Sequence, residues 1–203
     1  RYPRKSRYAR PLLLWSAPFV PAAAILVWCR PWLLWAGIIY AFAFAANVSF
    51  ARHKHERALS NDALFIAECL AIIPLMWAVS TSGQQWSIPT FSTAPSATWV
   101  AVIVCGLAMI GSTLHVKSLI RERANVAYRH ASVAWAIGSA VAAVGLAVII
   151  GGWGFALVIP FMFQAGRSLE MDKIPNRPAA IGMVELAGFV LVAGALALAV
   201  GMT

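Results

Sequence analysis

Charge is scarce in this sequence, and acidic charge is the scarcest. Only 11% of the 203 residues are charged, and seven residues are acidic. A soluble domain carries about 25% charged residues, which excludes a water-exposed globular domain. Hydrophobic residues make up 61% of the chain, and the mean hydropathy is +0.77. We therefore expect an all-α fold, a polytopic bundle of transmembrane helices that forms a single domain over residues 1–203.

Cysteine pairs and the common catalytic motifs are also lacking. Cys29, Cys69 and Cys105 form no CxxC pair, which argues against a disulfide or zinc framework and favours small packing residues. No GxSxG, HExxH, P-loop or GxGxxG motif stands in the context that it needs. His53 and His55 are two positions apart, so on a helix their rings would point to different faces. The residues themselves predict no dedicated metal centre.

Long apolar runs take the place of the missing charge. A helix rises about 1.5 Å per residue, so about 20 apolar residues cross a hydrocarbon layer of about 30 Å. Prolines inside the first and sixth runs predict a kinked and a broken helix there. By this criterion the sequence predicts about seven spans, at residues 11–28, 31–50, 63–80, 97–116, 131–150, 153–166 and 179–201.

The cations follow the order of the predicted spans. Fifteen of the sixteen Lys and Arg residues fall in four polar segments that alternate with nearly uncharged connections. Since Lys and Arg accumulate on the cytoplasmic side, we expect the N-terminus of this chain and the charged loops to be cytoplasmic and the C-terminus outside. The loops that carry the net charge of +9 would then contact membrane lipids, and we expect no nucleic-acid partner. The four segments are 1–10, 51–62, 117–130 and 167–178.

Two acidic residues interrupt apolar runs. Glu68 lies in LFIAECL and Glu185 in GMVELAG, where an ionised carboxylate is costly. Each is expected to face the bundle interior. There it either holds a proton, a metal ion or water, or forms a packing ion pair with a neighbouring Arg. Together with Asp62 they are the predicted catalytic residues.

A cationic stretch, HVKSLIRERANVAYRH at residues 115–130, connects the fourth and fifth runs. Lys117, Arg121 and Asn125 are spaced four apart and would share one face if the helix continued past the membrane. Because Lys and Arg bind phosphate oxygens, this face predicts an anion site. His115 is either a proton carrier or a hydrogen-bonded packing residue. The predicted ligand-binding residues are Arg57, Asn61, Lys117, Arg121, Asn125, Tyr128 and Arg167.

Several passages form a set of motifs. A VKxxIRERxxxxYR core begins at Val116 and leads into an SVAW-type helix, and an ERxLxND motif ends at Asp62. An RYARPLLLW opening and an IGMVE motif that ends at Glu185 accompany them. Together they resemble the YwiC-like family of bacterial membrane proteins, which implies a multi-pass protein of the bacterial plasma membrane. Members usually begin with helices that carry an HGAW motif, so the resemblance implies a chain without its leading spans.

A second resemblance is more distant. Two leading helices would bring the count to about nine spans, which is similar to the UbiA-type intramembrane prenyltransferases. Those enzymes use two aspartate-rich motifs to hold Mg²⁺ on a prenyl diphosphate. The resemblance implies Asn61-Asp62 with Glu68 as the first motif, and Glu170 and Asp172 with Lys173 as the second. The sequence departs from the pattern, because scattered acids hold Mg²⁺ poorly, so Mg²⁺ is a cofactor implied only by the resemblance.

Three functions fit these residues. The first is binding or transfer of a lipid-linked phosphate or diphosphate at the cytoplasmic face, with Lys and Arg on the phosphate and the carboxylates as bases or Mg²⁺ ligands. The second is a scaffold or assembly subunit whose polar loops bind partner membrane subunits. The third is a proton-coupled transporter in which Glu68 and Glu185 titrate.

Overall fold

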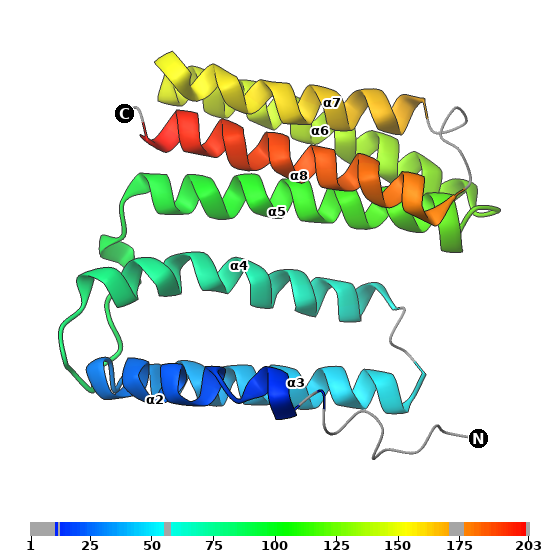
Figure 1. Cartoon of the computed structure of the whole chain (residues 1–203). Coiled ribbons are helices and arrows are strands. Elements are labelled where there is room, and N and C mark those ends of the chain that lie inside the picture. Colours follow the sequence, from blue (N-terminus) through cyan, green and yellow to red (C-terminus); the bar gives the residue numbers. More distant parts are fainter. Residues whose placement is uncertain (1–10, 12, 55–57, 171–176, 202–203) are drawn as a thin grey trace. The chain divides into compact units, whose positions relative to one another are not determined.

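The described part of the chain is mostly helical. This computed structural model describes residues 11, 13–54, 58–170 and 177–201, and no strand occurs among them. The all-α fold expected from the sequence is confirmed (Figure 1). The α-helices are α2 (Phe19–Cys29), α3 (Leu33–Arg52), α4 (Leu59–Thr81), α5 (Ser96–Val116), α6 (Val126–Ile150), α7 (Val158–Leu169) and α8 (Pro178–Gly201). Shorter turns are η1 (Phe91–Thr93), η2 (Lys117–Arg121) and η3 (Gly152–Leu157).

Five helices in the described ranges are long and apolar enough to cross a membrane. They are α3, α4, α5 together with η2, α6 and α8. Their ends differ from the predicted spans by at most five residues. The apolar helix at Leu13–Cys29 is shorter than these five. In the sixth predicted span a 3-10 turn, η3, precedes the twelve-residue α7. The first and sixth runs, which were predicted to be kinked and broken, therefore form the shorter helices.

The chain divides into two compact units, which we describe separately. The first contains residues 1–56 and 74–94, and the second contains residues 57–73 and 95–203. Helix α4 contributes to both, and Pro74 inside it stands at the boundary.

In the first unit, α2 and α3 lie side by side (Figure 1), and the turn between them is bound to the end of α4. Trp32 in this turn is 1% exposed. Its indole Nε1 donates a hydrogen bond to Ser82 Oγ at 3.0 Å, and its backbone N–H donates to the carbonyl of Gln85 at 3.2 Å. A buried Trp needs a partner for its N–H, so Ser82 holds the largest buried side chain of this unit in place.

Replacing Ser82 by alanine is expected to destabilise this turn by about 1–3 kcal/mol, because the buried indole N–H loses its acceptor. Hydrogen–deuterium exchange should become faster in residues 30–35 and 82–86. Thr81→Ala is the matched control, since the Thr81 hydroxyl is exposed and donates to the carbonyl of Trp77 in its own helix. Equal exchange in the two variants would contradict the prediction.

The second unit packs α5, α6, α7 and α8 against one another (Figure 1) around a core of mostly small side chains. On α6 the bulky Val141, Val148 and Ile149 point outward and are exposed. Helices in lipid approach each other through small residues and keep polar residues inside, and this unit follows that pattern. The buried residues of α6 are Ser132, Ala136, Ser139, Ala140, Ala143 and Ala147.

Local signals set the helix ends near the site. Asn125 caps α6, since its side-chain Oδ1 accepts a hydrogen bond from the N–H of Ala127 at 3.1 Å. Gly151 ends the same helix with a φ of 72°, a conformation that favours glycine. Pro178 opens α8, where its missing N–H costs nothing. As a result, the C-termini of α5 and α7 and the N-termini of α6 and α8 lie at one end of the unit (Figure 1).

Candidate functional site

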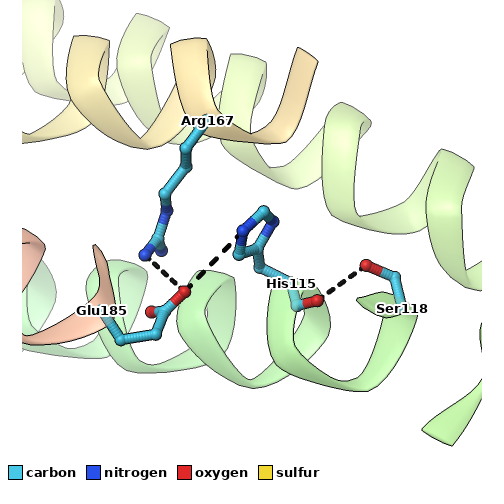
Figure 2. A network of polar contacts seen from close by, with 4 residues as sticks. All are labelled: His115, Ser118, Arg167 and Glu185. Carbon is cyan, nitrogen blue, oxygen red and sulfur yellow. Dashed lines mark hydrogen bonds and ion pairs between the residues drawn. The ribbon is translucent and has the colours of Figure 1, made fainter. Parts of the chain in front are cut away.

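Three ionisable side chains from three helices meet inside the second unit (Figure 2). Arg167 of α7 places Nη1 2.5 Å from Oε1 of Glu185 on α8. Nε2 of His115 on α5 lies 3.9 Å from the same oxygen. The His115 side chain is fully buried, and those of Arg167 and Glu185 are 7% and 10% exposed. One carboxylate oxygen therefore faces both a guanidinium and an imidazole.

Helical spacing brings these groups to the interior. His115 continues the buried row of Val104, Ala108 and Gly111 on α5, with steps of three and four residues. Glu185 occupies the matching inner row of α8. It follows Pro178 by seven residues, which places it about 10 Å into the helix at 1.5 Å per residue. Polar side chains thus stand at positions that small apolar residues fill further along the same helices.

Other polar groups surround the three. Gln164 and Ser168 of α7 are buried, and so is Ser118, whose Oγ donates a 2.7 Å hydrogen bond to the carbonyl of His115. Among the residues that the structure describes, neither ring nitrogen of His115 has a hydrogen-bond partner, and the same holds for Gln164 Nε2. An unpaired buried polar group costs about 1–3 kcal/mol, so a cluster with several such atoms is costly as a packing contact alone.

Two glycines make room for the cluster. A Cβ atom on Gly111 would overlap the amide nitrogen of Gln164 and would lie 2.7 Å from its Cδ. A Cβ atom on Gly188 would lie 3.6 Å from Nη1 of Arg167. Between these residues lies a cavity of about 10 Å³ lined by Gln164, Arg167 and Glu185 among others. Such a volume is about that of one water probe.

A second ion pair lies at the same end of the unit. Lys117, the first residue of η2, places Nζ 2.5 Å from Oδ2 of Asp62 on α4. Lys117 is only 5% exposed, whereas the Asp62 side chain is 24% exposed. Because Lys117 follows His115 by two residues, its side chain leaves α5 from a different side. The two ion pairs are therefore separate.

An apolar groove of about 430 Å³ leads away from Asp62. One wall is the first half of α4, from Leu59 to Leu70, and the other is formed by α5 and by Trp135 of α6. The indole of Trp135 is held in place because Nε1 donates to the carbonyl of Leu107 at 3.0 Å. At 1.5 Å per residue the α4 wall from Leu59 to Leu70 is about 16 Å long, and the part that leads away from Asp62 is about 12 Å, within half of the 30 Å hydrocarbon layer.

The structure brings together two pairs of the predicted site residues, Asp62 with Lys117 and Arg167 with Glu185. Arg121 and Asn125 are exposed. The predicted row from Lys117 to Asn125 is not formed, because the helix widens to the π-helical η2 at Lys117 and ends before Asn125. Asn125 instead caps α6.

The remaining predictions are placed as follows. Asn61, Glu68 and Tyr128 are half-buried. Among the described residues, no group of three or more His, Cys, Asp or Glu side chains is arranged to hold a metal ion, so we derive no step through Mg²⁺. Arg57 lies outside the described residues, as do Asp172 and Lys173 of the second UbiA-type motif.

Sequence reasoning left His115 out of the predicted site and missed Gln164. The signal for His115 was available, since a polar side chain continues a helical row of small residues at Ala108 and Gly111. No comparable signal marked Gln164. Its burial depends on the absence of a side chain at Gly111 in another helix, which sequence spacing does not reveal.

Comparisons with known proteins show a similarity to one family. A family model described as YwiC-like protein matches residues 1–77. The protein named "Uncharacterized protein YwiC" of Bacillus subtilis (strain 168) is 29% identical over 167 residues, which are 79% of this chain and 64% of that protein. Over residues 1–77 the chain is similar to the YwiC-like family.

A second relative extends the similarity. An "Uncharacterized protein" of Haemophilus influenzae (strain ATCC 51907 / DSM 11121 / KW20 / Rd) is 29% identical over 178 residues, 85% of this chain and 68% of that protein. Both alignments exceed 77 residues in length and so reach beyond the part that the family model matches. No solved structure matches the chain.

The family match contains only part of the candidate site. Residues 1–77 include Asn61, Asp62 and Glu68, and they end before Lys117 and Glu185. The chain spans less than two thirds of the Bacillus relative. The YwiC-like similarity and the five long apolar helices together make this chain a membrane protein.

Proposed function

We propose that this protein binds a lipid-borne phosphate or diphosphate, with the hydrocarbon chain in the groove between α4 and α5 and the phosphate at Lys117. The observation that carries the proposal is the apolar groove that ends at Asp62, the ion-pair partner of the buried Lys117. The groove thus fits the hydrocarbon chain of a lipid phosphate, and the Lys117 ammonium beside Asp62 fits its phosphate.

The length of the groove favours a single hydrocarbon chain of a lipid from one leaflet. From Asp62 to Leu70 the groove runs about 12 Å along α4, estimated from the helical rise, which lies within the depth of half a bilayer. Apart from Asp62, Thr113 and the anchored indole of Trp135, its lining is aliphatic. Hydrocarbon therefore fits the walls, and a polar group fits the end at Asp62.

The phosphate end is cationic as well. The Lys117 ammonium has three donors, so it can hold Asp62 and a phosphate oxygen at the same time. Arg121 and Arg123, further along the chain, are exposed, and they add positive potential in front of the pair. We place this end at the cytoplasmic face, because the connections at the opposite end of the second unit, residues 94–97 and 150–153, carry no charged residue.

The test is lipid binding by the purified protein in detergent, measured by native mass spectrometry. The probes are lysophosphatidic acid, which has one chain and one phosphate, a monoacylglycerol with the same chain, and inorganic phosphate. We expect lysophosphatidic acid to bind at least tenfold more tightly than either of the others. The monoacylglycerol lacks the charge-assisted hydrogen bond, which contributes about 1.5–3 kcal/mol, and inorganic phosphate lacks the chain, whose burial contributes about 0.8 kcal/mol per CH₂.

Two variants separate the phosphate contact from the fold. Lys117→Gln with Asp62→Asn removes both charges and leaves no unpaired buried ion, and it should lower lysophosphatidic acid binding by tenfold or more. Asp62→Asn alone keeps the ammonium and should keep the binding, although removing the carboxylate from this buried cation should lower the stability of the lipid-free protein. Equal binding by the double variant and the parent, or equal affinity for the monoacylglycerol, would refute the proposal.

A further inference from the structure

The cluster of His115, Arg167 and Glu185 lies apart from the lipid groove. Its residues come from α5, α7 and α8 (Figure 2), and none of them lines the groove. The cluster therefore calls for an explanation of its own, independent of lipid binding. Ionisable residues inside a membrane bundle are costly and usually functional.

The charge balance of the cluster indicates which charge it can accept. With Arg167 and Glu185 ionised and His115 neutral, the cluster has no net charge. Among the described residues, the polar groups next to it are Ser112 and Gln164, which line the same cavity, and Ser118, whose Oγ donates to the carbonyl of His115, and all of these are uncharged. The next cation along the chain, Lys117, already has Asp62 as its partner. The cluster can therefore gain one positive charge, but it has no second carboxylate to balance it.

The geometry shows where such a charge would go. His115 Nε2 faces Oε1 of Glu185 at 3.9 Å and has no hydrogen-bond partner among the described residues. Glu185 Oε2 likewise has none. The water-sized cavity beside Gln164, Arg167 and Glu185 adjoins the carboxylate. An acceptor nitrogen, a facing carboxylate and space for a water molecule are the parts of a proton-binding site.

We propose that His115, Arg167 and Glu185 form an internal proton-binding site that goes beyond the proposed lipid function. A proton from the nearer aqueous face binds His115 Nε2, and the resulting imidazolium donates a hydrogen bond to Glu185 Oε1. Glu185 then has two cationic partners, so proton binding weakens its pairing with Arg167. The uncompensated charge in apolar surroundings keeps the proton exchangeable.

The test is a pH titration of the full chain in lipid nanodiscs by NMR. His115 is the one histidine of this sequence that follows a leucine, so ¹³C-leucine with ¹⁵N-histidine labelling identifies its signals without any substitution. We expect the ring nitrogens of His115 to change reversibly from the neutral to the imidazolium pattern as the pH falls. Constant His115 signals over the whole range in which the protein stays folded would overturn the proposal.

Two substitutions test the coupling by its sign. Glu185→Gln removes the anion and should move the His115 midpoint to lower pH by about one unit or more, and Arg167→Gln removes the cation and should move it to higher pH. The exposed Arg123→Gln should leave it unchanged. A general loss of packing would not give opposite signs, so shifts in the same direction would refute the electrostatic link.

Discussion

Replacing Glu185 by alanine is expected to destabilise the second unit by about 3–5 kcal/mol, one of the two largest effects that this structure predicts. The change leaves the Arg167 guanidinium, 7% exposed, without the carboxylate that lies 2.5 Å from it. A buried ion pair contributes little net stability when both partners are present, but removing one partner leaves an uncompensated charge away from water. The cost comes from that charge rather than from the lost contact.

The measurement is the free energy of unfolding in detergent micelles, followed by circular dichroism. Glu170→Ala is the control, because Glu170 is exposed, and exposed substitutions usually stay within about 0.5 kcal/mol. Glu185→Gln combined with Arg167→Gln removes both charges and should cost less than Glu185→Ala alone. A double variant as unstable as the single one would show that packing, not the unpaired charge, is responsible.

Replacing Gly111 by leucine should also have a large effect, with a cost of about 1–3 kcal/mol or more from overpacking. The first side-chain carbon alone would overlap the amide of Gln164 and would lie 3.2 Å from Cδ1 of Trp135. Gln164 is a flexible side chain and can move, but the larger leucine would also press on Trp135. That indole is anchored to the carbonyl of Leu107 and forms part of the groove wall.

Gly145→Leu on α6 is the matched control. A Cβ atom built there meets no atom within 4 Å, and leucine forms helix better than glycine by nearly 1 kcal/mol. We expect Gly145→Leu to be neutral or slightly stabilising and Gly111→Leu to lower the unfolding midpoint clearly. Similar midpoints for the two variants would mean that α5 and α7 are not closely packed at Gly111.

The long helices were predictable from apolar length alone. Helices α5 and α8 begin and end within one residue of the predicted spans 97–116 and 179–201. Helix α6 begins five residues before its predicted span because Asn125 caps it, with Val126 as the first helical residue. Polar residues after a cap extend a helix beyond the membrane, so hydropathy underestimates its length there.

The site was predictable only in part. Glu185 could be assigned to the interior because a carboxylate in an apolar run has to avoid lipid, and a packing pair with an Arg was one of the two expected outcomes. The spacing of Lys117, Arg121 and Asn125 predicted one shared face, which the π-helical η2 breaks. A π turn changes the angle between successive residues, so a row computed for an α-helix does not continue through it.

The sequence by itself determined the all-α fold, how long most helices are, and that Glu185 must lie inside, because these depend on the cost of placing polar groups in hydrocarbon. Only the tertiary structure decided the partners: Asp62 with Lys117, and Glu185 with Arg167 and His115. Partner choice depends on which faces of different helices meet. That in turn depends on small residues such as Gly111 and Gly188, whose effect is felt only when a side chain from another helix enters the space they leave.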